Sequence, residues 1–140
     1  MNRRGFTLIE LITVAAIIGL LASIALLKTV QTRNRALRVA MLVDLKTLVT
    51  AQEGFFSGYR DYAGGVLPAE VAGTGGAGRA ALNLSSGNVI VVTYRDATGW
   101  SATMTNPRAT QEPATCGIFV GPLSYSPNAR VTQSGVPACY

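Results

Sequence analysis

The stretch that decides the fold is residues 6–27, FTLIELITVAAIIGLLASIALL. Its 22 residues contain a single charge, Glu10. As an α-helix rising about 1.5 Å per residue, such a segment is about 33 Å long, which matches the roughly 30 Å hydrocarbon core of a bilayer. The segment therefore either spans a membrane or is an export signal that is removed.

These two alternatives differ in length and polarity. A cleaved secretory signal needs an apolar core of only about 7–15 residues before a small-x-small site, which Ser23-Ile24-Ala25 would supply here. The apolar run is longer than that, and a carboxylate such as Glu10 costs about 2–3 kcal/mol or more inside a bilayer. A carboxylate retained at that cost indicates a function, whereas a position near the lipid headgroups would leave Glu10 merely tolerated.

The residues around Glu10 resemble a known processing site. Two basic residues, Arg3 and Arg4, precede the stretch Gly5-Phe6-Thr7-Leu8-Ile9-Glu10, and the apolar run follows. This order is similar to the class III signal peptide of type IV pilins and of the related pseudopilins of type II secretion. The resemblance implies that a prepilin peptidase in the membrane cleaves between Gly5 and Phe6 and N-methylates Phe6, so that residues 1–5 are a leader peptide.

Cleavage would place a new amine on Phe6, close to Glu10 along the helix. Residues four apart project from the same side of a helix, and a buried charge is tolerated when it is paired. The resemblance implies that each Glu10 neutralises the Phe6 amine of a neighbouring subunit during assembly. Related pilins commonly have proline where this chain has Leu27, and without that helix breaker we expect a more continuous helix.

The helical pattern continues beyond the apolar run. Apolar residues recur at helical spacing and polar residues share another face; the two sets are Val30, Leu37, Met41, Leu45, Leu48 and Phe55, and Lys46, Thr50, Glu53 and Ser57. We therefore expect a transmembrane helix over 6–27 that continues as an amphipathic helix over 28–58. A helix of this length cannot cover its own apolar half in so small a protein, so that half needs lipid or other copies of the chain.

The remaining residues predict a small sheet. Residues 59–88 are rich in glycine and predict a connecting loop. Three β-type runs follow within residues 89–140, namely VIVVTY at 89–94, WSATMT at 100–105 and CGIFV at 116–120. The predicted fold class is α+β, with the long helix packed on an antiparallel sheet of three to four strands and residues 28–140 forming one globular domain.

Two cysteines, Cys116 and Cys139, lie in this last region. A cysteine pair in an exported chain indicates a disulfide, and closing a loop of this length contributes about 3–3.5 kcal/mol in the chain-entropy model. A redox-active pair is the weaker alternative because the spacing is not Cys-x-x-Cys. We expect a C-terminal disulfide loop held against the sheet, a feature that the resemblance to pilins also implies.

The composition restricts the chemistry. The 140 residues include no His and carry 12 Lys plus Arg against 7 Asp plus Glu, a net charge of +5. Lack of His excludes Ser-His-Asp and Cys-His catalysis and His-ligated zinc, and two cysteines are too few for a four-cysteine metal site. The carboxylates are scattered singly along the chain. We therefore expect no enzyme, no metal site and no cofactor.

A basic cluster follows the apolar run, at Lys28, Arg33, Arg35 and Arg38. Counting positive charges alone would keep the following chain in the cytoplasm, whereas the cysteine pair and the resemblance favour the outside. We expect the cluster to meet lipid headgroups before assembly and acidic partners afterwards. Binding of nucleic acid is the weaker interpretation, with base stacking on Tyr59, Tyr62 and Tyr125.

The sequence thus predicts a structural subunit of a type IV pilus, single-pass in the inner membrane before assembly and part of an extracellular filament afterwards. Adhesion, motility or DNA uptake are the implied roles. The implied partners are other copies of the chain, a prepilin peptidase, and an inner-membrane assembly platform with its ATPase. The alternatives are a pseudopilin of type II secretion, and a secreted or anchored small β binding domain in which residues 6–27 are a plain signal or anchor.

Overall fold

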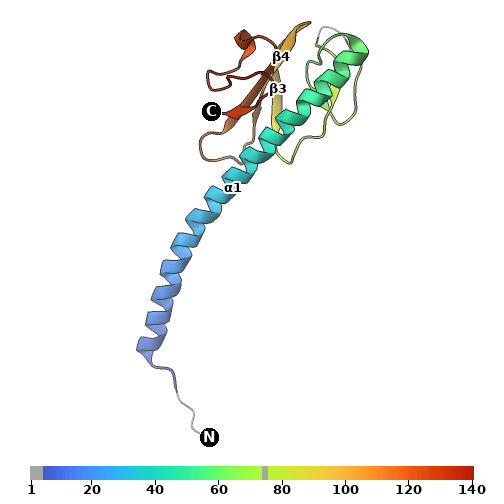
Figure 1. Cartoon of the computed structure of the whole chain (residues 1–140). Helices are drawn as coiled ribbons and strands as arrows, with labels where there is room; N and C mark the ends of the chain where they lie inside the picture. The colour runs from blue at the N-terminus through green and yellow to red at the C-terminus, as the bar shows by residue number, and fades with distance from the viewer. Residues whose placement is uncertain (1–4, 74–75) are drawn as a thin grey trace. The chain divides into compact units, whose positions relative to one another are not determined.

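The computed structural model describes residues 5–73 and 76–140 (Figure 1). The predicted leader therefore lies outside the described residues, except for Gly5. Backbone contacts divide the chain into two compact units, Met1–Arg33 and Asn34–Tyr140. One helix, α1 (Leu8–Tyr59, 52 residues), supplies nearly all of the described first unit and the first element of the second.

The ends of α1 have local causes. The helix begins directly after Thr7 and ends at Tyr59. The next residue, Arg60, has a φ of 56°, the left-handed conformation that commonly terminates helices. The chain that leaves the helix is held by Gln52, which is fully buried. Its side-chain amide donates to the carbonyl oxygen of Ala63 at 2.9 Å and accepts from the Ala63 N–H at 2.8 Å.

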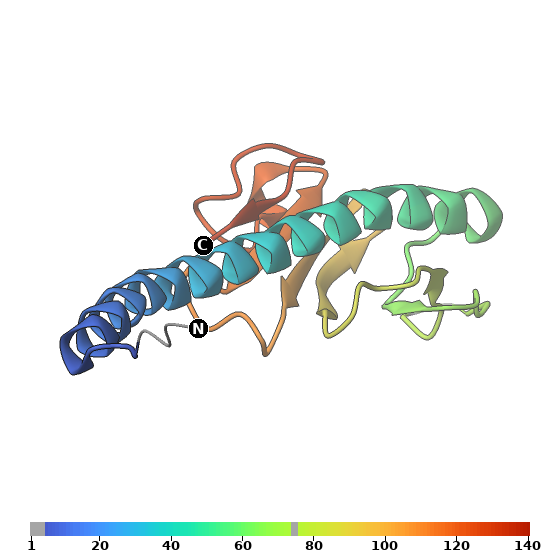
Figure 2. The ribbon, with the colours of Figure 1, turned by 90° about the horizontal axis from the view of Figure 1, so that it is seen from below.

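The second unit contains a four-stranded antiparallel sheet in the order β3-β4-β5-β6. The strands are β3 (Val89–Asp96), β4 (Gly99–Thr105), β5 (Thr115–Val120) and β6 (Ala138–Cys139). Figure 2 shows the Asn34–Tyr59 part of α1 crossing one face of this sheet. The predicted α+β class, with a long helix on an antiparallel sheet, is confirmed.

The core lies between α1 and the sheet. Most of its members come from the predicted apolar helix face and from the inward residues of two central strands; these are Met41, Leu45 and Leu48 with Trp100, Ala102, Met104, Cys116 and Ile118. Tyr62 and Leu82, from the segment between α1 and β3, complete the cluster. Fully burying an aliphatic side chain of this size contributes about 1.5–3 kcal/mol relative to exposure. This packing fixes which face of the Asn34–Tyr59 helix remains in solvent.

The disulfide between Cys116 and Cys139 is present and joins β5 to β6, as predicted. The two cysteines are also register partners in the sheet. The C-terminal segment covers the sheet face away from the helix, because a Cβ added at Gly117 would lie 2.7 Å from Pro127 Cγ. Phe119 and Val131 are both 1% exposed as a result.

The glycine-rich region at 59–88 contains more structure than the predicted connecting loop. Two short strands, β1 (Val66–Leu67) and β2 (Ala80–Ala81), pair in parallel. Strands of two residues are too short to produce a periodic pattern in the sequence. Glycine is required at Gly78, where a Cβ would overlap the ring of the buried Phe55.

Candidate functional site

The predicted cleavage point lies at the extended start of the described chain. Phe6 is 82% exposed, and Gly5 and Phe6 precede the first residue of α1. A Cβ added at Gly5 would meet no described atom within 4 Å. Packing within the described chain therefore gives no reason for glycine at this position.

Glu10 caps the helix on which it lies. Its Oε2 accepts from the Thr7 N–H at 3.1 Å and from Thr7 Oγ1 at 3.0 Å, while the Glu10 N–H donates to Thr7 Oγ1 at 3.3 Å. This reciprocal pattern is a capping box. Sequence reasoning missed Thr7, although Thr-x-x-Glu before an apolar run is the recognised signature. Glu10 therefore has a local role in addition to the predicted one in assembly.

The apolar part of α1 satisfies its own polar groups and exposes its apolar ones. The hydroxyl of Thr13 donates to the Glu10 carbonyl oxygen at 3.0 Å, and that of Ser23 donates to the Leu20 carbonyl oxygen at 2.8 Å. Large apolar side chains from Phe6 to Leu26 are 52–82% exposed. The helix is long and apolar enough to cross a membrane, and a segment of this kind suits lipid or a protein partner.

The basic cluster divides into two kinds of residue. Lys28, Arg33 and Arg35 are exposed. Arg38 instead binds the chain between β4 and β5, where its guanidinium donates to the carbonyl oxygens of Glu112 at 2.7 Å, Pro113 at 3.0 Å and Gln111 at 3.2 Å. Arg38 thus has a contact within the chain that the sequence analysis did not predict, because these carbonyls lie more than 70 residues away in the sequence and leave no local signal.

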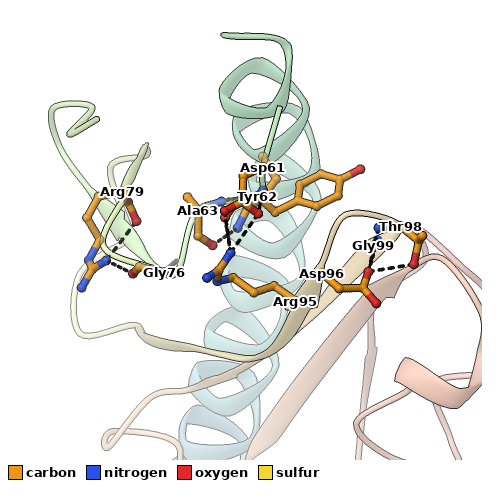
Figure 3. A network of polar contacts seen from close by, with 11 residues as sticks. Asp61, Tyr62, Ala63, Gly76, Arg79, Arg95, Asp96, Thr98 and Gly99 are labelled. Carbon is orange, nitrogen blue, oxygen red and sulfur yellow. Dashed lines mark hydrogen bonds and ion pairs between the residues drawn. The ribbon is translucent and has the colours of Figure 1, made fainter. Parts of the chain in front are cut away.

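A polar network ties the segment after α1 to the end of β3 (Figure 3). Arg95 Nη1 forms an ion pair with Asp61 at 2.9 Å and donates to the Tyr62 carbonyl oxygen at 3.2 Å. In the same view Arg79 points toward Gly76, to whose carbonyl oxygen it donates at 2.7 Å. The arginines therefore serve to hold loops in the second unit.

A second polar group surrounds Asp96 in the β3–β4 turn. Its carboxylate accepts from the hydroxyl of Tyr125 at 2.6 Å, from that of Tyr94 at 3.0 Å and from the N–H and hydroxyl of Thr98, both at 2.7 Å. The bond from Tyr125 is the largest of the causes that hold the pKa of Asp96 well below its usual range. The bonds to Tyr125 and Asp96 raise the pKa of Tyr94 to about 12.

The tyrosines considered for base stacking have other contacts. Tyr62 is 8% exposed and stacks on Phe56 with ring centroids 4.7 Å apart. Tyr59 donates to Glu70 Oε1 at 3.1 Å, and Tyr125 is half-buried beside Tyr94. The described residues hold no group of three or more His, Cys, Asp or Glu side chains that could bind a metal ion.

Two comparisons with known proteins found similar sequences. Residues 1–26 match the family model described as the prokaryotic N-terminal methylation motif. The chain is 46% identical over 65 residues to the type IV major pilin protein PilA of Myxococcus xanthus (strain DK1622), an alignment that covers 44% of this chain and 30% of the relative. The methylation motif and the similarity to a major pilin confirm the resemblance to the type IV pilin family and support a pilin-like structural subunit.

Proposed function

We propose that this chain is the structural subunit of a type IV pilus. A prepilin peptidase cleaves it between Gly5 and Phe6 and methylates the new amine of Phe6. Residues 6–27 anchor the mature chain in the inner membrane before assembly. An assembly platform and its ATPase then transfer it into an extracellular filament made of copies of the chain.

The observation that carries this proposal is the exposure of the apolar helix. Twelve large apolar side chains between Phe6 and Leu26 are more than half exposed. In water such a surface is unstable, since each buried CH₂ group is worth about 0.8 kcal/mol. Lipid covers it before assembly, and neighbouring copies cover it in a filament. The processing motif lies directly before this surface, so cleavage exposes a new helix terminus at the beginning of the assembly segment.

Glu10 contributes to the proposed assembly through its charge. The mature Phe6 amine is a cation at the helix N-terminus, where a lone charge among apolar side chains is expensive. Glu10 of a neighbouring copy neutralises that cation and fixes the relative height of the two subunits. Its Oε2 also accepts from Thr7 within the same chain, so the cap and the intermolecular pair share one carboxylate.

The test is the intact mass and first residue of the chain from its native cell envelope, followed by imaging of sheared filaments. A chain that starts with Phe6 and is about 14 Da heavy supports processing as a pilin, and filaments that contain it support assembly. A chain that starts at Leu26 is an ordinary secreted protein and would overturn the proposal. A processed chain found only in envelope-bound fibres tied to secretion would instead identify a pseudopilin.

A further inference from the structure

Two tyrosines from distant parts of the second unit have their rings in contact. Tyr94 lies near the end of β3, and Tyr125 is the last residue of η1 (Leu123–Tyr125), a 3₁₀ helix between β5 and β6. The ring centroids are 4.4 Å apart and the ring planes are tilted by 38°, a spacing just below the range of about 4.5–7 Å that is typical of aromatic pairs. Among the described residues this is the one ring contact between two tyrosines.

The ring of Tyr125 is held in place by close backbone on two sides. A Cβ added at Gly99 or at Gly121 would lie 3.1 Å from a carbon of this ring. Gly99 begins β4 and Gly121 directly follows β5, so the ring lies over one end of the two central strands. Its hydroxyl lies 2.8 Å from that of Thr98 in the β3–β4 turn. The contact with Tyr94 is therefore a fixed feature of this end of the sheet.

Both phenol hydroxyls donate to one oxygen of the same carboxylate. Asp96 Oδ2 accepts from Tyr125 at 2.6 Å and from Tyr94 at 3.0 Å. Its other oxygen accepts from Thr98 and Gly99 in the turn, which fixes the carboxylate (Figure 3). A phenol that loses an electron becomes a far stronger acid than a carboxyl group, so it transfers its proton even to a carboxylate of low pKa. Each ring therefore has the proton acceptor that its one-electron oxidation requires.

The tyrosine pair is also open to an oxidant. Tyr94 is 45% exposed, and exposed side chains change rotamer within nanoseconds, so its ring can turn an edge toward the ring of Tyr125. Other easily oxidised groups are withdrawn. Both cysteines are in the disulfide, so the described residues offer no free thiol to reduce a tyrosine radical, and Trp100 is fully buried. A radical on either tyrosine therefore has the other tyrosine as a partner in direct contact.

We propose that Tyr94 and Tyr125 form an oxidative coupling site, at which a haem peroxidase acting with hydrogen peroxide joins the two rings into a dityrosine within one chain. Each tyrosine gives up one electron and its phenol proton, and the two radicals form a bond between the ring carbons next to the hydroxyls. The hydrogen atom on each of those carbons then moves to the phenol oxygen and restores the aromatic ring. The two electrons and two protons reduce one hydrogen peroxide to two water molecules.

The new bond would fasten the edge of the sheet to the C-terminal segment. β3 lies at the edge of the sheet beside β4, whereas Tyr125 lies in the segment that the disulfide between Cys116 and Cys139 closes. A covalent bond between segments far apart in the chain restricts the unfolded state as a disulfide does. The coupled unit is therefore expected to resist unfolding better. This inference concerns the second unit alone and does not depend on filament assembly.

The test treats the full chain, dilute and solubilised in detergent, with a plant haem peroxidase and hydrogen peroxide. We expect a monomer that is lighter by two hydrogen atoms and shows the blue fluorescence of dityrosine. Trypsin places Tyr94 and Tyr125 in separate peptides, 80–95 and 109–130, so after reduction of the disulfide a joined pair of these peptides identifies the bond. Chains labelled with heavy nitrogen are mixed with unlabelled chains, and coupling within one chain gives joined peptides in which both members or neither carry the label.

Phenylalanine variants supply the matched controls. Tyr94→Phe keeps the ring and removes the phenol, so the yield of chains that carry an internal dityrosine is expected to fall about tenfold or more, because coupling depends on two phenols held together. Tyr59 is 38% exposed and its ring contacts Phe55, which has no phenol. Tyr59→Phe should therefore leave the yield within about twofold of the unmodified chain. In concentrated urea the same oxidant should couple the five tyrosines without preference.

The stabilising effect is measured on the coupled monomer. Its melting temperature is expected to exceed that of the untreated chain by about 5 °C or more, and oxidised Tyr94→Phe should show no such rise. Three results would overturn the proposal: joined peptides that pair labelled with unlabelled chains, other tyrosine pairs coupled in the folded chain as often as Tyr94 with Tyr125, or an internal dityrosine that persists in Tyr94→Phe.

Discussion

The carboxylate of Asp44 accepts two hydrogen bonds from Ser85, from its N–H at 2.8 Å and from its hydroxyl at 2.9 Å. Asp44 is 6% exposed on α1, and Ser85 lies in the segment that leads into β3. Asn88 donates to the same carboxylate at 2.7 Å and accepts at 2.7 Å from Asn106, which follows β4. One buried acid therefore joins the helix to the connections at one end of the sheet.

Replacing Asp44 by Ala is expected to lower the free energy of unfolding by about 2–4 kcal/mol. The amide of Asn88 and the N–H of Ser85 would lose a charged acceptor in a buried place, which costs more than an ordinary hydrogen bond. Thermal unfolding of the detergent-solubilised chain, followed by the near-ultraviolet circular dichroism of Trp100, measures the change. Thr50→Ala, at an exposed position on the same helix, is the control. Equal melting temperatures of the two variants would contradict the prediction.

Arg38 and Arg35 provide a matched pair, since both lie on α1 but only Arg38 binds backbone carbonyls. We expect Arg38→Ala to cost about 1–2 kcal/mol of stability and Arg35→Ala less than about 0.5 kcal/mol. Arg38→Lys should recover little, because one ammonium group cannot reproduce a guanidinium that reaches three carbonyls. Hydrogen exchange at the N–H groups of Thr110 and Gln111 gives a local measure. Unchanged exchange in Arg38→Ala would show that Arg38 does not hold this connection.

The Asp96 group predicts a loss of stability in acid. The pKa of Asp96 is held below its ordinary value of 3.8, first by the bond from Tyr125. A carboxyl group with a depressed folded-state pKa stabilises the fold above its unfolded pKa, and this contribution is lost as the pH falls through the folded value. The melting temperature should therefore decrease as the pH is lowered below about 4, and Tyr125→Phe should make that decrease smaller. A decrease of the same size in Tyr125→Phe would mean that other carboxylates cause it.

The stability contributed by Tyr94 is lost at high pH, the opposite direction to that of Asp96. Its pKa is raised to about 12 by hydrogen bonds to Tyr125 and Asp96. A raised folded-state pKa stabilises the protein below the unfolded value of about 10, and the contribution is lost as the pH rises from about 10 to 12. Ultraviolet titration should therefore show a tyrosine that ionises later than the others, and Tyr94→Phe should remove that step. Its persistence in Tyr94→Phe would assign it to a different tyrosine.

Periodicity predicted the elements better than it predicted their contacts. Met41, Leu45, Leu48 and Phe55, expected on one helix face, are all buried. Val30 fits the same pattern and is 45% exposed, because it lies in the first unit, before the sheet begins to cover the helix. β6 was not expected, since a strand of two residues is recognisable only through the pairing of Cys139 with Cys116.

Polar contacts between residues close in the sequence could be predicted, whereas those between distant residues could not. The capping box of Thr7 and Glu10 is local and could have been recognised from its spacing. The contact of Asp44 with Ser85 spans 41 residues and that of Arg38 with Pro113 spans 75. Contacts of that kind depend on how the connections fold back over the helix, and no pattern in one sequence predicts them.

The two roles of Glu10 can be separated by substitution. Gln at this position still accepts from Thr7, because glutamine serves in a capping box as glutamate does, but it carries no charge for the Phe6 amine. Thr7→Ala removes the hydroxyl that completes the cap and leaves the carboxylate of Glu10. We expect Glu10→Gln to reduce the yield of sheared filaments about tenfold or more, and Thr7→Ala to weaken the first helical turn by about 0.5–2 kcal/mol with a smaller effect on filaments.

The comparison is decisive only when cleavage is intact in both variants, which the mass of the mature chain establishes. If Glu10→Gln loses filaments and Thr7→Ala keeps them, the assembly defect is caused by the missing charge. In that case Glu10→Gln fails although its helix cap is intact, and Thr7→Ala assembles although its cap is impaired. The reverse result would assign the role of Glu10 to helix capping and remove the intermolecular pair from the mechanism. Thr7→Ser completes the set, because serine restores the cap hydroxyl and should return the helix to its original stability.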